Sequence, residues 1–432
     1  MTEMSARTRL DACLARIAEP RGEGARAITR LYADEARVAA AAADARAKFG
    51  HSLGPLDGMI VSIKDLFDVA GEPTAGGSVV YREAAPAARD AEIVRRLRAA
   101  GAVIIGKTNM TEFAFSGIGL NPHYGTPANP ADRARVPGGS SSGAAVALAD
   151  GFCEASIGTD TGGSTRIPAA FCGLVGFKPT QRRVPRDGAM ALSYTLDSIG
   201  PISRTVAESA LIDACLAGES ERALAPAPAD QMRLAMPLGR LFEKLDADVT
   251  QGFERAIKRL LDAGVAIVDI DIEPLLARID EINALGSISA IEAACEHAAI
   301  LETQADRIDR RVVARIRGGS NVPAATYVRM LKLREALARD AARLFARHDA
   351  LVLPSVATVA PQIAALEASD AEFSAANILT LRNTTQFNVL DCCAISLPLR
   401  TQALPVGLML VAAHGADHRL FDVAAGVEAL LA

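Results

Sequence analysis

Two short Gly-Gly-Ser sequences, which end at Ser140 and Ser164, constrain this chain more than any other feature. Glycine adopts backbone conformations that are closed to other residues and lets the main chain approach a ligand closely. A glycine pair directly before each serine therefore predicts a backbone built around two hydroxyl groups. The arrangement favours a serine hydrolase without a catalytic histidine, in which one serine attacks the substrate and the other passes protons.

A single lysine, Lys64, ends an apolar run that is typical of a buried strand. Burial disfavours the ammonium form, and free lysine has a pKa of about 10.4. A lysine that is neutral at pH 7 needs a pKa lowered by roughly three units, on the order of 4 kcal/mol, which few places other than an active site maintain. A lysine at a strand end is more often a surface residue with its charge in solvent. The two serine sequences favour the catalytic interpretation.

The segment 138–180 closely resembles the amidase signature family, and Lys64 stands where the catalytic lysine of that family precedes it. The likeness extends through residues 106–113, 129–130 and 198–202 to a weaker match at residues 404–408. Residues 50–215 and 350–412 fall within it. The resemblance implies an α/β fold, the amidase signature fold: a single large domain with a mixed central β-sheet covered by helices on both faces.

Carried over to this sequence, the family pattern implies three catalytic residues. It makes Ser164 the nucleophile, Ser140 a bridging serine that follows a cis peptide bond, and Lys64 the general base. The pattern also implies an oxyanion hole made by the backbone amides of Thr161, Gly162, Gly163 and Ser164. The residue types agree with this role, because glycines leave amides unobstructed and a helix that begins near Ser164 adds the positive end of its dipole.

Four further residues are expected beside these groups: Gly139, Ser141, Asp160 and Arg166. Asp160 would orient backbone amides or pair with Arg166. We interpret Arg166 as structural, with bidentate binding of a substrate carboxylate as the alternative. Ser141 and Ser142 are interpreted as hydroxyls that satisfy backbone groups at a helix start. Ser142 is also a departure from the commoner family pattern, which has glycine there.

The other polar residues near glycine-rich segments receive structural interpretations. Lys107 and Lys178 are expected to be solvated or structural, and His123 to lie in the core or at the rim of the pocket. The six histidines form no pattern that supplies a metal site or a partner for Ser164. The glycine-rich segments lack the lysine that a phosphate-binding loop places before its Ser or Thr, so nucleotide binding is a weak competitor.

The chain has 432 residues, which is long for one average domain, but no polar linker divides it. We therefore expect one domain with four parts. They are N-terminal helices in residues 1–49, the signature core in 50–215, a helical cover in 216–349, and strands and a helix that complete the sheet in 350–432. Residues 217–230, rich in Ala, Pro and Glu, are expected to be a surface connection within that domain.

Alternation of short β-branched runs with helical spacing also favours a mixed sheet covered by helices. Strands are predicted at residues 59–63, 103–105, 155–158, 233–236, 265–270, 351–354, 394–398 and 406–411. Helices are predicted at residues 6–18, 28–48, 91–100, 249–263, 274–305, 324–347 and 417–430, after Ser142 and near Ser164. We expect the first two helices to pack on the catalytic body and to serve a dimer, and those after residue 270 to cover the pocket.

Composition restricts the partners of this chain. The net charge is −5, so there is no basic footprint for nucleic acid or an anionic membrane, and no run of eighteen apolar residues is present. The expected partner is a small-molecule amide, and the expected assembly is a homodimer, as in many relatives. The N-terminus lacks the apolar core of a secretion signal, and the seven cysteines show no repeated Cys-x-x-Cys pattern, which predicts reduced thiols and a cytoplasmic location.

The predicted activity is hydrolysis of a carboxylic amide to a carboxylate plus ammonia or an amine. Neutral Lys64 withdraws a proton through Ser140, Ser164 forms an acyl-enzyme, and water releases it, with no metal or organic cofactor. The alternatives are the glutaminase component of the tRNA-dependent glutamine amidotransferase, its A-type subunit, which shares these motifs, and a catalytically silent binding protein. Aliphatic amides, aryl amides, ureido acids and dicarboxylic half-amides remain open as substrates.

Overall fold

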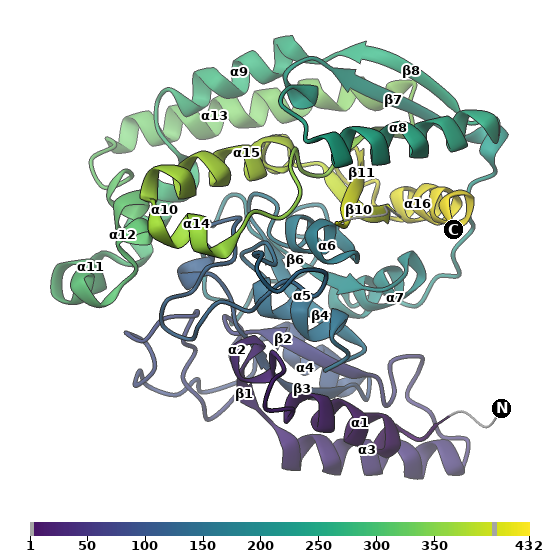
Figure 1. Ribbon diagram of the computed structural model, residues 1–432, viewed down its shortest axis with the longest axis vertical. Helices are drawn as coiled ribbons and strands as arrows, with labels where there is room; N and C mark the ends of the chain where they lie inside the picture. Colours follow the sequence, from purple (N-terminus) through teal and green to yellow (C-terminus); the bar gives the residue numbers. More distant parts are fainter. Residues whose placement is uncertain (1–3, 400–403) are drawn as a thin grey trace.

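A mixed sheet of eleven strands forms the centre of the computed structural model, which describes residues 4–399 and 404–432 (Figure 1). In spatial order the strands are β1 (Ile28–Leu31), β3 (Val103–Thr108), β2 (Ile60–Lys64), β4 (Ala155–Asp160), β6 (Ser198–Ser203), β5 (Val175–Lys178), β10 (Cys393–Leu399), β11 (Val406–Ala412), β9 (Ala350–Pro354), β7 (Arg233–Leu238) and β8 (Ala266–Asp271). β2 is parallel to β3 and β4, and β7 is parallel to β8 and β9. The remaining neighbours are antiparallel.

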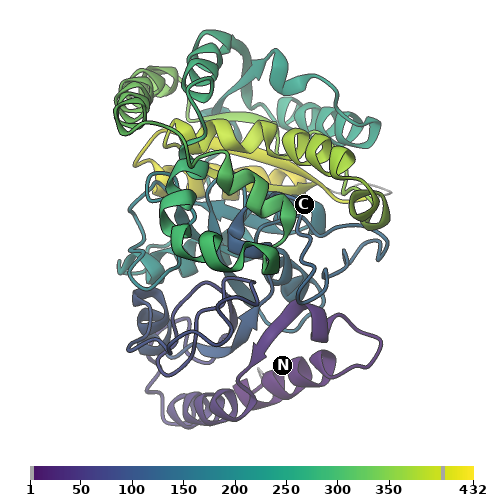
Figure 2. The same cartoon turned by 90° about the vertical axis from the view of Figure 1, so that its left-hand side faces the viewer.

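Helices pack on both faces of this sheet (Figures 1 and 2). One face carries α1 (Ala6–Ile17), α3 (Ala33–Lys48), α5 (Ser142–Ala149), α6 (Arg166–Cys172), α9 (Glu273–Asn283), α13 (Ala324–Ala341) and α15 (Asp370–Val389). The other face carries α4 (Glu92–Ala99), α7 (Val206–Ala217), α8 (Ala247–Asp262) and α16 (Asp417–Leu431). The apolar core therefore lies in two layers, and the predicted α/β class with helices on both faces is confirmed.

Shorter elements complete the chain at the sheet edges and strand ends. They are α2 (Gly24–Ala27), α10 (Ile288–Glu296), α11 (Ala298–Gln304), α12 (Arg310–Arg317), α14 (Ile363–Ala368) and the 3-10 helices η1 (Glu112–Ala114), η2 (Ala229–Gln231), η3 (Arg240–Phe242), η4 (Ala305–Arg307) and η5 (Ala342–Ala346). Among the described residues, no single helix combines the length and apolarity of a membrane span. Only the bent pair Glu273–Glu296 and Ala298–Arg307, at 70°, passes on length and composition together.

Side-chain alternation along β2 decides where Lys64 points. Ile60 packs with α1, α3 and α5, whereas Val61 packs with α4 on the opposite face. Ser62 returns to the α5 face, where its hydroxyl lies 2.7 Å from that of Ser156. Because side chains along a strand alternate between faces, Lys64 shares the face of Ile60 and Ser62. This is the face from which α5 approaches.

Every predicted strand is confirmed, but two predicted helices need correction. Residues 28–48 do not form one helix, because Ile28–Leu31 pairs with the free edge of β3 and the helix begins only at Ala33. Residues 274–305 form three helices: Gly286 adopts φ 142° after α9, and Ser287 caps the start of α10. A left-handed glycine followed by a serine N-cap ends one helix and begins another.

Some elements were not predicted, for different reasons. β6 contains Gly200 and Pro201, two residues that are poor in strands, yet it pairs with β4 and β5 in the sheet interior. α12 and α15 were not predicted, although Ser369 caps α15 by accepting a hydrogen bond from Glu372 N. The Ser-x-x-Glu spacing at that helix start is a signal that would have found it.

Candidate active site

Lys64 lies at the end of β2 and is completely buried. Its Nζ donates hydrogen bonds to Ser140 Oγ and to Thr159 Oγ1, both at 2.8 Å. Burial lowers the pKa of Lys64 to about 7, although the carboxylates of Asp197 and Asp160 oppose the shift. A substantial fraction of the amine is therefore neutral at pH 7 and able to accept a proton.

Ser140 is held in place through its main chain. The peptide bond between Gly139 and Ser140 is cis, and the Ser140 carbonyl accepts a hydrogen bond from Thr111 N at 3.1 Å. Gly139 N donates to the Gly117 carbonyl at 2.8 Å. A side chain at Gly139 would clash with the backbone of Gly119 at 2.7 Å, so glycine is needed there for close packing. The segment that begins at Thr111 thus positions Ser140 under Lys64.

Ser164 lies in the turn between β4 and α6 and is 4% exposed. Its carbonyl accepts a hydrogen bond from Ser141 N at 3.3 Å, which brings the two Gly-Gly-Ser sequences side by side. Within the described residues, the Ser164 hydroxyl has no hydrogen-bond partner, so it is available to a ligand. Lys64, Ser140 and Ser164, which lie far apart in sequence, are therefore gathered at the ends of β2 and β4.

Asp160 organises the turn that carries Ser164. Its Oδ1 accepts a hydrogen bond from Gly163 N at 2.8 Å, and its Oδ2 accepts from the backbone and the hydroxyl of Thr165. Burial raises the pKa of this carboxyl, but the charge and hydrogen bonds of Arg166 outweigh burial and hold the pKa well below its usual range. Asp160 is therefore ionised, as a carboxylate that accepts several N–H bonds should be.

Every N–H group of the Arg166 guanidinium has a partner inside the protein. Its guanidinium pairs with both oxygens of Asp160, at 3.0 and 2.9 Å, and Nη2 also donates to Asn388 Oδ1 at 2.6 Å. Nη1 donates to the Thr384 carbonyl at 3.2 Å and contacts Met409 Sδ. The side chain is 0% exposed, so no N–H remains to bind a substrate carboxylate. The structural interpretation of Arg166 fits this geometry.

Three of the four predicted oxyanion-hole amides are free in the described part of the chain: Thr161, Gly162 and Ser164. The expectation for Gly163 needs correction, because its N–H already donates to Asp160. Carbonyl contacts on the far side of the loop set the direction of the peptides: Asp160 O accepts from Ser198 Oγ at 3.0 Å and Gly163 O accepts from Ile167 N at 2.7 Å. The helix dipole comes from α6, which begins at Arg166.

Several residues of this site were not singled out in the sequence. Thr159 binds Lys64, Asp197 accepts a hydrogen bond from Thr161 Oγ1 at 2.5 Å, and Thr384 and Thr385 of α15 donate to the Gly162 carbonyl at 2.6 and 3.1 Å. Thr159 lies within the segment 138–180 that resembles the family, and Asp197 directly precedes the matching segment 198–202. The α15 residues come from more than 200 positions away, so only the tertiary fold brings them to the loop.

The two serines after Ser140 do not cap a helix as expected. Ser141 stands at the N-cap position of α5, but its hydroxyl reaches the Thr159 carbonyl, at 3.4 Å, and bonds no helix amide. The Ser142 hydroxyl is buried and has no partner among the described residues. The Ser141 side chain packs closely against β4, since a Cβ on Gly158 would lie 2.6 Å from Ser141 Oγ.

Lys107 and Lys178 are buried instead of solvated. Lys107 lies 3.9 Å from Glu72, and Lys178 donates to the carbonyls of Pro179 and Cys392 at 2.8 Å, so the structural alternative holds for both. His123 Nε2 lies 3.0 Å from Glu112 Oε1. Across residues 4–399 and 404–432, no cluster of three His, Cys, Asp or Glu side chains has the arrangement of a metal site.

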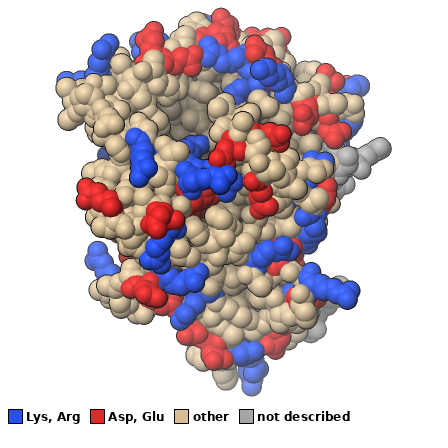
Figure 3. Space-filling view, turned by 60° about the vertical axis from the view of Figure 1, so that its left-hand side comes forward, with Lys and Arg blue, Asp and Glu red and all other residues tan. Residues whose placement is uncertain are grey.

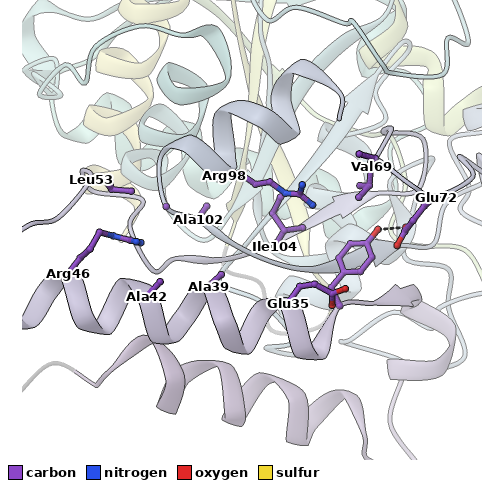
Figure 4. A pocket seen from close by; sticks show the side chains of 13 residues that line it. Glu35, Ala39, Ala42, Arg46, Leu53, Val69, Glu72, Arg98, Ala102 and Ile104 are labelled. Atoms are coloured by element: carbon purple, nitrogen blue, oxygen red, sulfur yellow. Dashed lines mark hydrogen bonds between the residues drawn. The ribbon is translucent and has the colours of Figure 1, made fainter. Parts of the chain in front are cut away.

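One cavity lies apart from these residues. A cavity of about 500 Å³ between α3 and the strand end at Ile104 has Tyr32 and Glu72 in its wall, joined by a hydrogen bond of 2.7 Å (Figure 4). Its lining includes none of Lys64, Ser140 and Ser164. Figure 3 shows a hollow in the upper half of the molecule, with basic and acidic side chains both near its rim.

Known proteins resemble this chain over nearly its whole length. A family model described as Amidase matches residues 9–421. The chain is 37% identical to 2-amino-5-chloromuconic acid deaminase of Comamonas testosteroni, covering 92% of this chain and 86% of the relative. It is 35% identical to the A-type subunit of the Glutamyl-tRNA(Gln) amidotransferase of Anaeromyxobacter sp. (strain K), covering 97% and 92%. A solved crystal structure of an amidase superposes with a TM-score of 0.86 at 32% identity, covering 99% and 97%.

Proposed function

The chain belongs to the Amidase family, and on that premise we propose that it hydrolyses a small-molecule carboxylic amide with Ser164 as nucleophile, Ser140 as bridging serine and Lys64 as base. Amidase activity on C–N bonds follows from the family and its relatives. The residue roles rest chiefly on one observation: the buried Lys64 amine, with its pKa near 7, donates to Ser140 Oγ at 2.8 Å. A lysine of this kind serves as a general base at neutral pH.

In the proposed reaction, Ser164 Oγ attacks the amide carbon while its proton passes to Ser140, whose own proton passes to Lys64. The carbonyl oxygen becomes an oxyanion, which the free amides of Thr161, Gly162 and Ser164 stabilise. The C–N bond then breaks as Ser140 returns a proton to the leaving nitrogen, so ammonia or an amine departs and an acyl ester on Ser164 remains. Water, deprotonated through the same relay, attacks the ester and releases the carboxylate.

A panel of aliphatic, aryl, ureido and half-amide substrates tests this function by ammonia release, alongside labelling of the protein with a fluorophosphonate. We expect release from at least one class and a covalent adduct on Ser164, because its hydroxyl has no hydrogen-bond partner among the described residues and belongs to the loop that carries the free amides. A folded protein that hydrolyses no amide and takes no label would instead support the catalytically silent alternative.

The pH dependence of the reaction follows from the protonation state of Lys64. We expect kcat/KM to fall about tenfold per pH unit below roughly pH 7 and to level off above it, because only the neutral amine can accept the proton. Activity falls on the acidic side because burial lowers the pKa of Lys64 to about 7, and the amine is protonated below that pH. A pH–rate profile measures this. A profile that is flat across neutral pH would contradict the assignment.

Lys64→Arg is the matched control for the pH profile. Arginine keeps the positive charge and much of the length of lysine, but it stays protonated at every pH of the assay. We expect this variant to be inactive even at high pH. Recovery of activity at high pH in Lys64→Arg would mean that another group sets the profile.

A second candidate is the A-type subunit of a tRNA-dependent amidotransferase, favoured by 35% identity to such subunits over nearly the whole chain. That role uses the same hydrolysis of an amide but needs a partner to receive ammonia. Purification of the native protein from its source, with a glutaminase assay before and after removal of copurifying proteins, separates the two. Glutaminase activity that disappears with the partner would favour the amidotransferase role.

We also propose a homodimer in the cytoplasm. Exposed apolar side chains gather on and after α3, where Val38 is 72%, Phe49 69% and Leu53 53% exposed, and they provide apolar area for a second copy. All seven cysteines are free, as expected in a reducing compartment. The mass of the protein by light scattering tests the dimer, and Val38→Asp should shift it to the monomer. Cell fractionation tests the compartment.

A further inference from the structure

Asp197 is a buried carboxylate that pairs with no cation in the described part of the chain. Only 7% of the residue is exposed. Its Oδ1 accepts a hydrogen bond from Thr161 Oγ1 at 2.5 Å, and its Oδ2 accepts from Leu192 N and Ser193 N at 2.9 and 3.0 Å. All three donors are neutral. Burying a charge among neutral groups is costly, so a cation close by would stabilise this carboxylate.

The register of the sheet brings Asp197 close to Lys64. β4 and β6 run antiparallel, and their last paired residues are followed by Thr161 on one segment and preceded by Asp197 on the other. Thr159, two residues before Thr161, accepts a hydrogen bond from Lys64 Nζ at 2.8 Å. Side chains two residues apart along an extended segment point to the same side. The two threonines therefore place the amine and the carboxylate on one side of the end of β4.

Two carboxylates act on Lys64, and they differ in how their own charge is balanced. Burial lowers the pKa of Lys64, and the charge of Asp197, followed by that of Asp160, opposes this shift. Asp160 is already paired with Arg166 through both of its oxygens, at 3.0 and 2.9 Å. Asp197 has no such partner, so its charge is left to act on the lysine.

Arg186 also acts on Asp197, but its donors bind main-chain carbonyls. Nη1 lies 3.2 Å from the Ser193 carbonyl oxygen, and Nη2 lies 2.8 Å from that of Tyr194. Burial raises the pKa of the Asp197 carboxyl, and its hydrogen bonds and the charge of Arg186 offset only part of this effect. An ammonium at Lys64 would therefore stabilise the ionised carboxylate, and the carboxylate would stabilise the ammonium.

Two acidic side chains of α10 face the loop that carries Asp197. Glu292 accepts a hydrogen bond from the hydroxyl of Thr195, and Glu296 accepts one from the hydroxyl of Tyr194. Neither is among the charges that shift the pKa of the lysine at the end of β2. These carboxylates hold the loop in place, and Asp197 is the one that acts across it.

We propose that Asp197 is a positioning residue for the base: its carboxylate balances the ammonium that forms when Lys64 takes up the proton of Ser140. This rests on the proposed function of the Ser164 site. The proton moves from Ser164 through Ser140 to Lys64 and returns to the leaving nitrogen, and Asp197 exchanges none of it. An opposite charge favours the ionised form of its neighbour, so Asp197 strengthens the base and stabilises the proton while the C–N bond breaks.

Asp197→Asn tests this by removing the charge while keeping an oxygen that can accept from Leu192 N and Ser193 N. In a pH profile of kcat/KM, we expect the acidic limb to move about one pH unit lower, because the ammonium of Lys64 loses its nearby anion. The plateau should fall roughly tenfold, because the neutral amine is then a weaker base. A purely structural role would lower the rate equally at every pH. A limb that stays at its wild-type pH would overturn the proposal.

Two variants serve as controls for the profile. Asp417 is a buried carboxylate with similar bonds, which accepts from Thr180 N at 2.8 Å and from Thr180 Oγ1 at 2.7 Å, but its charge does not act on Lys64. Asp417→Asn should leave the acidic limb at its wild-type pH. Asp197→Glu keeps the charge and should do the same, even with a lower kcat. A limb that moves as far in either control as in Asp197→Asn would contradict the assignment.

Titration of Lys64 without turnover separates this proposal from the proposed function. Carbon-13 NMR of the lysine Cε groups, with Lys64→Met to identify the signal, should show Lys64 titrating about one pH unit lower in Asp197→Asn than in the wild type. If the wild-type protein hydrolyses no amide but this shift is seen, the hydrolase function fails and the coupling stands. If Lys64 titrates alike in both proteins, the coupling fails whether or not the enzyme hydrolyses amides.

The reciprocal titration applies if Asp197→Asn does not fold. Coupling between two sites is mutual, so loss of the ammonium in Lys64→Met should make one buried aspartate titrate about one pH unit higher than in the wild type. Carbon-13 NMR of the aspartate carboxyl groups measures this. Asp160 is not confused with it, because Arg166 holds the pKa of Asp160 well below its usual range. Identical carboxyl titrations in the two proteins would overturn the proposal.

Discussion

Ser164→Ala is expected to reduce amide hydrolysis by about 10⁴-fold or more, and Lys64→Ala by a similar factor, because each removes an essential member of the proposed proton path. The double variant should be little slower than either single variant, because removing either residue already interrupts the same proton path. Measurement of kcat for the three proteins on one amide tests this. Losses that multiply would mean that the two residues act in separate steps.

Ser142→Ala provides the matched control for this series. Ser142 lies in the same glycine-framed segment as Ser140 and is equally buried, but its hydroxyl has no partner among the described residues. Removing an unpaired buried hydroxyl costs little and can stabilise the protein. We expect Ser142→Ala to keep wild-type kcat and an unchanged or higher melting temperature. A large loss of activity in this control would place the chemistry on a different serine from Ser140.

Asp160→Ala is expected to destabilise the protein by about 3 to 5 kcal/mol, the usual cost of leaving one partner of a buried ion pair uncompensated. The change removes both contacts to Arg166, at 3.0 and 2.9 Å, and frees the Gly163 amide at the same time. Activity should fall as well, because the turn that carries Ser164 loses its organising carboxylate. Urea unfolding followed by circular dichroism measures the stability.

The matched control for this prediction is Asp262→Ala. Asp262 pairs with Lys258 at 2.7 Å, as close as the buried pair, but both side chains are largely exposed. An exposed pair on a helix contributes only about 0.3 to 0.5 kcal/mol, so the unfolding midpoint should barely move. Similar losses in Asp160→Ala and Asp262→Ala would show that burial of the Asp160 pair has no special weight.

The Asp160 pair also predicts how wild-type stability depends on pH. Because Arg166 depresses the pKa of Asp160 in the folded state, the contribution of this carboxylate is complete above the ordinary pKa of aspartate, about 3.9, and is lost as pH falls below it. If Asp160→Ala does not fold, acid unfolding of Arg166→Met gives a second measurement. Arg166→Met should be less stable than the wild type at pH 7, and it should lose less stability as pH falls below about 3.9, because the pKa of Asp160 in the folded state is no longer held down by Arg166.

Local patterns were sufficient for much of the sheet and for singling out the three groups that we propose to react. The strand of Lys64 is a run of apolar residues that can only be buried, and the glycine pairs before Ser140 and Ser164 mark tight backbone positions, so these features are visible without tertiary information. β6 could not be predicted, because its local sequence is unlike that of a strand. Its Gly200 and Pro201 disfavour a strand locally, and pairing on both edges overrides that preference.

What the sequence determined by itself is the set of chemical groups: two serines in glycine-framed turns and one lysine at the end of an apolar strand. Only the tertiary structure decided their states and the shape of the site around them. Burial lowers the pKa of Lys64, Asp160 accepts a hydrogen bond from the Gly163 amide that was expected in an oxyanion hole, and α15 orients the loop. The physical reason is that a pKa or a free hydrogen bond depends on which distant groups share one small volume, whereas strand and turn preferences are set by neighbours along the chain.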